Sequence, residues 1–438
     1  MTRYETTELE RLYERWDQLG REERTESFRA LPRQEAQDLF VDLTSQHQAM
    51  LLLDLPEAER RIWLRLLEPD DAADLIQEAP EENRTELLAL LDDLSRREVS
   101  ALLAYEEDEA GGLMSPRFAR LRPDMTVDQA ISYLRLQGPH LETIYYAYVL
   151  DHEQRLLGVV SFRDLFATPG NRAVSDLMQC DLVSASEETD QEEIARLFAD
   201  HDLLALPVVD AEGRMKGIVT VDDIVDVVQE EASEDIQKIG GMEALDAPYL
   251  ATGFWDLVRK RAGWLSALFV GEMLTVTAMA HYEEQLAQAI VLAVFIPLII
   301  SSGGNSGSQA STLVIRAMAI GEVRLRDWWR VLRREILSGL MLGGVLAVLG
   351  LLRVLIGDAL GSKVYGGYPT AIGLTVGISL LGVVVFGTIC GSMLPFLLRR
   401  VNLDPASASA PLVATLVDVT GLIIFFSVAG LLLSGKLL

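Results

Sequence analysis

The sequence predicts a multidomain, mainly α-helical membrane protein. It is expected to contain an N-terminal helical superhelix, a pair of α/β repeats, a connecting helix and five transmembrane helices. Three observations lead to this prediction. Acidic charge is concentrated in the first part of the chain, long apolar segments fill the last part, and one motif occurs twice between them.

Charge and apolar residues are segregated along the chain. The 438 residues carry a formal net charge of −27, although half of them are apolar. Residues 1–250 hold 55 acidic and 24 basic side chains, whereas residues 251–438 hold 10 and 14. The acidic part argues against nucleic acid as a partner, because the phosphate backbone would repel it. The first residues, MTRYETTELERLYERW, lack the apolar core of a cleaved signal peptide, so we expect the acidic part in the cytosol.

Residues 1–110 are predicted to form a cytosolic helical domain with a regular repeat. Apolar residues return every twelve positions, at Leu31, Leu43, Leu55, Leu67, Ala79 and Leu91. A proline or a polar turn residue often follows, and proline is well tolerated in the first turn of a helix. Each unit therefore predicts a short helix, and pairs of units predict helical hairpins that stack into a small superhelix.

The motif that occurs twice lies within residues 113–231, and we place its copies at 111–170 and 171–229. Equivalent residues are Leu113 and Leu177, Met114 and Met178, Gly158 and Gly217, and Asp164 and Asp223. In each copy an amphipathic segment precedes two short apolar runs, and another helical segment follows. This order predicts an α/β unit whose two apolar runs are strands joined by a turn.

The last part of the chain reads as a transmembrane domain at 256–438, after a connecting helix at 230–255. Five apolar segments lie at 262–281, 287–318, 331–357, 370–398 and 408–433. Each is near the roughly 20 residues that a helix needs to cross a bilayer. Basic residues gather in VRKR, RLRDWWRVLRR and LLRRVN, which lie on alternate loops. The positive-inside rule therefore puts these loops and the N-terminus in the cytosol and the C-terminus outside.

The second apolar segment contains the polar stretch SSGGNSGSQ, residues 301–309. Irregular backbone is tolerated at membrane depth only inside protein or beside water. We interpret the stretch as a wet, broken helix that lines an ion pathway, since its glycines permit a break and its side chains offer oxygen atoms. The alternative is a face of small residues that packs against another helix.

The last apolar segment holds an acidic residue, Asp418, and no basic residue. An acidic side chain at the bilayer centre costs about 2.5–3.5 kcal/mol on insertion scales and usually marks an ion or proton pathway. Ala414, Thr415 and Asp418 fall within one turn and can share a face. Glu272 in the first segment is a weaker candidate for the same pathway, and a structural ion pair is the alternative for Asp418. Oxygen ligands without a Cys or His cluster favour a hard cation such as Mg²⁺.

Four stretches together resemble the MgtE-type magnesium transporter family: EEDEAGGLMSP, TVDDIVDVVQEEASEDI, GGNSGSQ and LVDVTGL. The paired repeat also resembles tandem CBS domains, which commonly sense adenine nucleotides or ions. The resemblance covers nearly the whole chain in the right order. It implies a homodimer in the cytoplasmic membrane that conducts Mg²⁺ and is no enzyme. It also implies that cytosolic Mg²⁺ closes the pore through the connecting (plug) helix.

The resemblance implies site residues as well. The pore positions are Asp418, Asn305, Ala414 and Gly304. The regulatory magnesium positions are Asp70, Asp74, Asp190, Glu192, Asp202, Asp223, Asp226, Glu231, Glu234 and Asp235. ATP is a second implied ligand, at Tyr146, Arg163 and Asp164. Two departures bear on these positions: Leu203 stands where an aromatic residue can pack on adenine, and Ala410 stands where an asparagine can occur.

Acidic residues also crowd near the connecting helix, at Asp222, Asp223, Asp226, Glu230, Glu231, Glu234 and Asp235. Carboxylates that lie close together repel one another. Divalent ions between domains would remove that repulsion and draw the domains together, and a ligand shifts such an equilibrium through its differential affinity for the two states. The crowding therefore predicts a magnesium-sensitive gate.

Three alternatives remain open at this point. The first is a transporter of another divalent cation, such as cobalt, manganese or calcium. The second is a membrane-anchored nucleotide sensor without a pore, which would need neither Asp418 nor the glycine-rich stretch. The third is a CBS-regulated anion channel, which the negative charge of Asp418 disfavours. The scattered histidines and the lack of a phosphate loop or HExxH motif argue against an enzyme.

Overall fold

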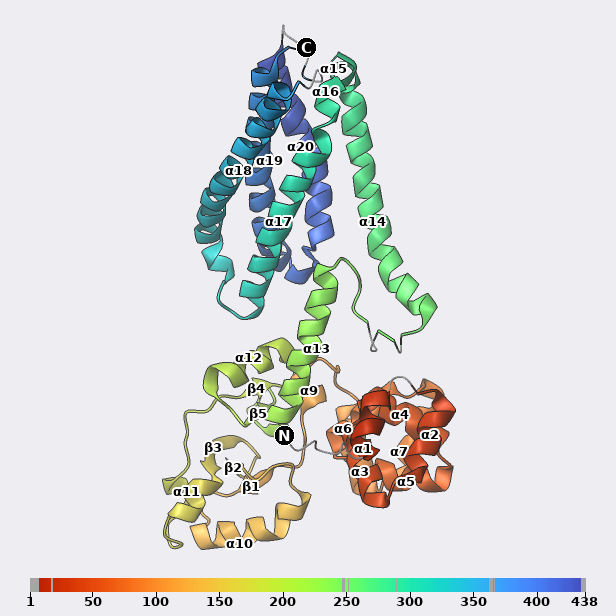
Figure 1. Cartoon of the computed structure of the whole chain (residues 1–438). Helices are drawn as coiled ribbons and strands as arrows, with labels where there is room; N and C mark the ends of the chain where they lie inside the picture. Colours follow the sequence, from red (N-terminus) through yellow and green to blue (C-terminus); the bar gives the residue numbers. More distant parts are fainter. Residues whose placement is uncertain are drawn as a thin grey trace, which may run out of the picture. The chain divides into compact units, whose positions relative to one another are not determined.

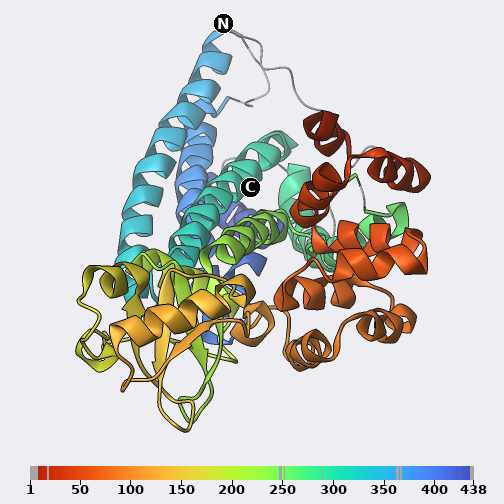
Figure 2. The same ribbon diagram turned by 90° about the horizontal axis from the view of Figure 1, so that it is seen from below.

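A computed structural model describes residues 8–434, except 17–18, 246–248, 251, 289, 362–364 and 366. The chain divides into two compact units, Met1–Glu231 and Ala232–Leu438. The first unit contains the N-terminal helices and the paired α/β repeats, and Figures 1 and 2 show these as two neighbouring lobes. The second unit contains the apolar helices.

The N-terminal lobe follows the twelve-residue repeat closely, since α3 to α8 each begin twelve residues after the start of the helix before. The helices are α1 (Glu8–Arg15), α2 (Arg21–Ala30), α3 (Arg33–Asp42), α4 (Ser45–Asp54), α5 (Glu57–Leu64), α6 (Pro69–Glu78), α7 (Glu81–Leu90) and α8 (Asp93–Leu102). The recurring apolar residues from Leu43 to Leu91 are buried where one helix ends and the next begins. Even-numbered helices pack on one another, and the predicted helical superhelix is confirmed.

Each α/β repeat forms its own three-stranded sheet. The strands are β1 (Ala119–Leu121), β2 (Tyr146–Leu150), β3 (Leu156–Ser161), β4 (Ala185–Ser186), β5 (Ala205–Val209) and β6 (Met215–Thr220). The helices are α9 (Ala110–Leu113), α10 (Val127–Gln137), α11 (Phe162–Ala167) and α12 (Gln191–His201). In both sheets the first strand pairs parallel with the second, and the second pairs antiparallel with the third. The predicted internal repeat is therefore confirmed.

The two repeats are tied together by a reciprocal contact. A Cβ atom on Gly158 would lie 2.9 Å from the Cβ of Met178, and one on Gly217 would lie 2.8 Å from the Cγ of Met114. The segment in front of each repeat thus packs on a strand of the other repeat. This contact explains why the same methionine and glycine occur in both copies, because a side chain at either glycine would displace the methionine.

The connecting helix α13 (Val221–Ile239) differs from the expected position at both ends. It begins directly after β6, inside the second repeat, because VDDIVDVVQEE is already amphipathic. It ends at Ile239, where Gly240 and Gly241 follow and Gly241 has a φ of +77°, a conformation that favours glycine and commonly terminates helices. The boundary between the two units falls within α13.

The end of α13 is anchored within the second unit. Lys238 binds Asp404 at 2.7 Å between its Nζ and the aspartate Oδ2, and it also binds Glu234 on its own helix. Ile239 packs against Ala406 and Ala408, in and beside the short 3₁₀ helix η6 (Pro405–Ser407). Asp404 and η6 lie directly before the last long helix of the chain. This contact therefore joins the end of α13 to the start of that last helix.

The second unit is a bundle of long apolar helices (Figure 1). They are α14 (Phe254–His281), α15 (Glu283–Gln288), α16 (Ile290–Ala293), α17 (Ile296–Ala319), α18 (Trp328–Ala359), α19 (Pro369–Arg400) and α20 (Ala410–Leu433). Among the described residues, five helical segments are long and apolar enough to cross a membrane. This number confirms the prediction. Helix α19 packs against α17, α18 and α20 and is the most buried of the five.

The expectation of a broken helix at SSGGNSGSQ is wrong, because residues 301–309 lie inside the continuous helix α17. Its glycines instead allow close packing on α19. A Cβ atom on Gly303 would lie 2.4 Å from the Cγ1 of Val383, and one on Gly307 would lie 2.9 Å from the carbonyl oxygen of Gly387. For the glycines, the structure therefore agrees with the alternative interpretation, a face of small residues that packs against another helix. The interruption of this segment lies at residues 294–295, between α16 and α17.

Candidate functional site

The membrane site lies where α17 contacts α20. A Cβ atom on Gly303 would lie 2.7 Å from the Cγ1 of Val417, so the missing side chain lets the two helices approach. A Cβ atom on Gly304 would lie 3.6 Å from the Cβ of Ala414. The structure thus brings together Gly304 and Ala414, two of the predicted pore positions, from segments more than one hundred residues apart.

Asp418 lies one helical turn beyond Ala414 on α20. Its side chain is partly exposed and interacts with the side chain of Glu272 on α14. Helices α14 and α20 also meet at Gly271, where a Cβ atom would lie 3.0 Å from the Cγ2 of Thr415. Within the described part of the chain neither carboxylate forms an ion pair with a basic side chain. Two acidic groups therefore meet inside the membrane-spanning segments, and a structural ion pair does not explain Asp418.

The polar side chains of α17 have different roles. Asn305 is exposed, and its Nδ2 lies 3.5 Å from the Oγ of Ser301 one turn before it. Ser308 and Ser311 donate to the carbonyl oxygens of Ala410 and Ala408, at 3.3 and 2.7 Å, and tie α17 to the start of α20. Asn305, next to Gly304, thus offers an exposed amide oxygen as a possible ion ligand where α17 and α20 cross.

A second site lies in the first unit and consists of carboxylates on α6, α13 and the loops near them. Asp70, in the first turn of α6, is only 8% exposed, and among the described residues its Oδ1 atom has no hydrogen-bond partner. Its carboxylate faces Glu142 and Asp223 closely enough for electrostatic repulsion. Asp74, one turn further along α6, faces Glu107 and Asp223 in the same way.

Burial and mutual repulsion raise the pKa of these carboxyl groups. Burial, with repulsion from Glu107, raises the pKa of Asp74 to about 8. Burial also raises the pKa of Glu142 to about 7 and that of Asp223 to about 6, although hydrogen bonds from Ser115 and Thr220 act in the opposite direction. Such shifts indicate that the charged forms are destabilised, and a bound cation would relieve this cost.

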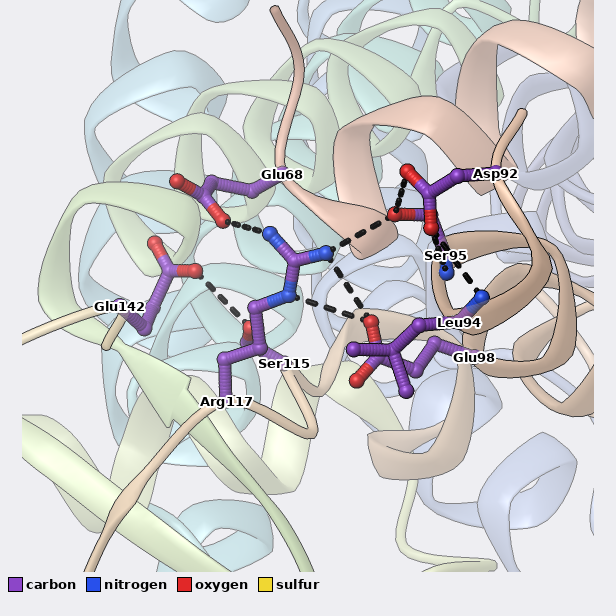
Figure 3. A network of polar contacts seen from close by, with 8 residues as sticks. All are labelled: Glu68, Asp92, Leu94, Ser95, Glu98, Ser115, Arg117 and Glu142. Carbon is purple, nitrogen blue, oxygen red and sulfur yellow. Dashed lines mark hydrogen bonds and ion pairs between the residues drawn. The ribbon is translucent and has the colours of Figure 1, made fainter. Parts of the chain in front are cut away.

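Arg117 links the paired repeats to the N-terminal lobe (Figure 3). Its Nη1 binds the Oε2 of Glu68 at 3.0 Å, and its Nη2 binds the Oε2 of Glu98 at 3.0 Å and the Oγ of Ser95 at 3.2 Å. Glu68 is the N-cap residue of α6, directly before the turn that carries Asp70. The backbone N–H of Glu142 donates to the carbonyl oxygen of Arg117 at 2.8 Å. Arg117 therefore holds Glu68 through its side chain and Glu142 through its main chain, and both residues border the acidic site.

Four of the other predicted regulatory positions make contacts at or near α12. Asp190 caps α12 and accepts a hydrogen bond from the backbone N–H of Glu192 at 2.9 Å. Asp202 ends α12 in a left-handed conformation with a φ of 51°. Glu231 accepts a hydrogen bond from the Nε2 of Gln191 at 2.6 Å, which ties α13 to α12. Asp190 and Asp202 thus have local structural roles.

The last three positions follow along α13. Asp226 is exposed and lies close enough to Asp71 to raise the pKa of that residue. Glu234 is engaged by Lys238. Burial lowers the pKa of Lys238, but the hydrogen bonds that its ammonium donates to Asp404 and Glu234 outweigh this effect, and the pKa lies above its ordinary value. Asp235 is partly buried on the same helix.

Sequence reasoning missed the roles of Glu68, Glu107, Arg117 and Glu142. Glu107 belongs to the acidic run EEDE, which offered a signal. Arg117 and Glu142 lie in the first repeat, but neither belongs to a charge run or to the residues that the two copies share. They meet α6 only because the chain folds back on the N-terminal lobe, so no local signal could have found them.

The predicted nucleotide positions lie together at one end of the first sheet. Tyr146 begins β2 and pairs in register with Ser161 of β3. Arg163 and Asp164 follow in the first turn of α11, where Asp164 accepts a hydrogen bond from the hydroxyl of Ser161 at 2.6 Å. Nucleotide binding at these residues stays a prediction.

The chemistry of both sites suits a hydrated hard cation. Among the residues that the structure describes, no group of three or more His, Cys, Asp or Glu side chains is arranged to hold a metal ion. Mg²⁺ loses its water reluctantly and is usually held through one or two carboxylates and several waters. Neighbouring carboxylates such as Asp418 and Glu272, or Asp70 and Asp223, fit that mode of binding.

The chain matches known families along nearly its whole length. A family described as MgtE, divalent cation transporter, matches residues 296–428. The MgtE intracellular N domain matches residues 8–108, and the CBS domain matches residues 110–169 and 174–230.

Individual relatives agree with these matches. The chain is 44% identical over 421 residues to magnesium transporter MgtE of Thermus thermophilus, covering 95% of this chain and 91% of that protein. It is 33% identical over 334 residues to magnesium transporter MgtE of Enterococcus faecalis, covering 76% and 71%. The crystal structure of the cytosolic domain of the Mg²⁺ channel MgtE in complex with ATP shares 44% identity, with a TM-score of 0.48 over 51% of this chain and 91% of that one. By its sequence and the order of its domains, this chain belongs to the MgtE family of divalent cation transporters.

Proposed function

We propose that this protein carries Mg²⁺ across the cytoplasmic membrane as a homodimer, with its N-terminus in the cytosol and its C-terminus outside. Its relatives in Thermus and Enterococcus are named magnesium transporters. The observation that carries the proposal is the meeting of Asp418 with Glu272 inside the membrane-spanning segments. Acidic groups are costly at that depth and are usually retained where an ion passes.

The ion pathway in this proposal follows the adjacent faces of α17 and α20. Asp418 supplies the charge, Asn305 supplies a neutral oxygen, and the Gly304–Ala414 contact keeps the two helices close. In a dimer, two copies of Asp418 would face one divalent ion across the axis. Rings of acidic side chains select cations in this way.

The pathway is tested by magnesium uptake into proteoliposomes that contain the full chain. Asp418→Asn is expected to abolish most uptake while the protein stays folded and dimeric. Asp358→Asn is the matched control, because Asp358 is exposed near the end of α18, and it is expected to transport normally. Undiminished uptake by the Asp418 variant would overturn the assignment. Competition by Co²⁺, Mn²⁺ and Ca²⁺ in the same assay separates magnesium from the other divalent cations.

We further infer that cytosolic Mg²⁺ closes this pathway through α13. This helix carries Asp223 in the acidic site near its start and Lys238, bound to Asp404, near its end. Mg²⁺ bound at the acidic site would supply the positive charge that its crowded carboxylates lack. The proposed ligands there are Asp70, Asp74 and Asp223 from the predicted regulatory positions, together with Glu107 and Glu142, which lie in the same cluster.

The gate is tested by neutralising four carboxylates of α13 together. Asp223→Asn, Asp226→Asn, Glu231→Gln and Asp235→Asn are expected to leave uptake intact. Inhibition by Mg²⁺ on the cytosolic side should then need a concentration about tenfold higher, within the usual range of allosteric coupling. Asp124→Asn with Glu153→Gln is the control, since both residues are exposed on the first repeat. Unchanged inhibition would remove these residues from the gate.

ATP remains a second proposed ligand of the first unit, at Tyr146, Arg163 and Asp164. Leu203 is partly exposed in the turn before β5 and offers an apolar but not an aromatic surface. Equilibrium binding of ATP to the full chain, with Arg163→Ala as the comparison, decides whether a nucleotide binds at these residues.

A further inference from the structure

A cavity of about 490 Å³ lies in the membrane unit between α17, α18 and α19. Its walls are largely apolar and include Phe295, Leu298, Leu346, Leu349 and Leu380. Several of these side chains, such as Leu298 and Leu349, are well exposed, so the cavity is an open groove. It lies away from Asp418, which does not line it.

One charged side chain, Arg353 of α18, also lines this groove. Its Nη1 lies 3.4 Å from the hydroxyl of Tyr365, and among the residues that the structure describes it forms no ion pair. Arg353 is inside a segment long and apolar enough to span a membrane. A cation in such a place is costly unless it reaches the interface or meets an anion. Its charge also makes the groove a poor route for Mg²⁺.

The arrangement around Arg353 depends on a glycine one turn along α18. A Cβ atom on Gly357 would lie 2.4 Å from the hydroxyl of Tyr365 and 3.0 Å from the Nη1 of Arg353. The missing side chain therefore makes room for the guanidinium and the hydroxyl to lie side by side. Tyr365 is 5% exposed, so its hydroxyl is held in place beside the groove.

We propose that this groove binds an anionic phospholipid. The phosphate would accept hydrogen bonds from Arg353 and Tyr365, and an acyl chain would lie along Leu298 and Leu349. Arginine pairs well with phosphate because its planar guanidinium offers parallel donors. Arg353 lies six residues before the end of α18 at Ala359, which is about 9 Å along a helix. A long side chain can bridge that distance to the phosphate layer, which in the proposed topology is that of the outer leaflet.

The proposal is tested with delipidated full-length protein in detergent, to which dioleoyl phosphatidylglycerol is added. Native mass spectrometry is expected to show a lipid that stays bound to each chain. Arg353→Ala should lower its affinity about tenfold, as expected for the loss of a charge-assisted contact, and Arg353→Lys should lower it less. Arg316→Ala is the control, because Arg316 is exposed in the last turn of α17 and lines no part of the groove.

Two further arms separate the possible occupants. Leu298→Trp, which fills the groove and keeps the charge, is expected to weaken phosphatidylglycerol binding, and dioleoyl phosphatidylethanolamine should bind more weakly than phosphatidylglycerol. Glycerol phosphate without acyl chains should not compete. Equal binding by the Arg353 and Arg316 variants, or full competition by glycerol phosphate, would overturn the proposal. A disulfide-linked dimer formed by Leu349→Cys would also overturn it, because the groove would then be covered by a second copy.

Discussion

The two proposed ion sites use opposite arrangements. In the first unit, carboxylates from the N-terminal lobe and both repeats crowd around α6 and the start of α13, with Arg117 beside them. In the second unit, Asp418 has one acidic neighbour, Glu272, and the surrounding contacts are made by glycines and small side chains.

This difference follows from the solvent around each site. In a domain that borders water, several partly buried carboxylates can be gathered, and a bound cation relieves their repulsion. In a bilayer each charge is expensive, so few are kept, and the site depends instead on how closely the helices approach. The proposed magnesium sensor therefore depends on a cluster of carboxylates, whereas the proposed ion pathway depends on how closely the helices pack.

The largest expected effect concerns packing in the membrane unit. Gly391→Ala is expected to destabilise the chain by about 1–3 kcal/mol, as other overpacked substitutions do, because its Cβ would lie 2.0 Å from the carbonyl oxygen of Gly307. Gly344→Ala on α18 is the matched control, with no atom within 4 Å of its Cβ. Thermal inactivation of the full chain in detergent measures both. Equal midpoints for the two variants would show that the α17–α19 contact is not this close.

A smaller effect is expected when Arg117, the basic side chain beside the acidic site, is replaced. Arg117→Ala leaves Glu68 and Glu98 without their partner, so the carboxylates at the start of α6 are no longer held in position for a cation. Half-maximal inhibition of uptake should then need about fivefold more Mg²⁺, and Arg117→Lys should fall between, because lysine cannot make the same set of contacts. Arg155→Ala, which loses only the exposed pair with Glu153, is the control. Identical inhibition curves for the Arg117 and Arg155 variants would contradict the positioning role of Arg117.

The smallest effect is a dependence on pH in the absence of Mg²⁺. The pKa values of Asp74, Glu142 and Asp223, at about 8, 7 and 6, exceed the ordinary values of about 4 for unfolded chains. At these three groups the folded unit therefore binds more protons than the unfolded chain. Their contribution to stability is fully present below about pH 4 and is lost as pH rises through 6 to 8. Melting of the full chain at pH 6 and 8 measures this slope. Glu142→Gln should flatten it, and a stability that rises from pH 6 to 8 would contradict the raised pKa values.

The sequence alone was sufficient where the signal is local and periodic. The twelve-residue recurrence from Leu31 to Leu91 predicted the helices of the N-terminal lobe, and apolar length predicted five membrane-spanning segments. Both predictions depend on apolar residues alone, because a helix that buries a face or crosses a membrane needs them at regular spacing or over a sufficient length. The acidity of the first unit and the isolation of Asp418 in an apolar segment were equally visible.

Other features depend on contacts between distant segments, and only the tertiary structure decided them. SSGGNSGSQ is compatible with both a break and a packing face, and the structure shows that it is helical and packs against Gly387 and Gly391 of α19. Likewise, Glu142 and Arg117 join the acidic site through chain folding that no short pattern records. Local sequence determines which segments form helices and what each can bury, whereas the neighbours of a charge are determined by packing across the whole unit.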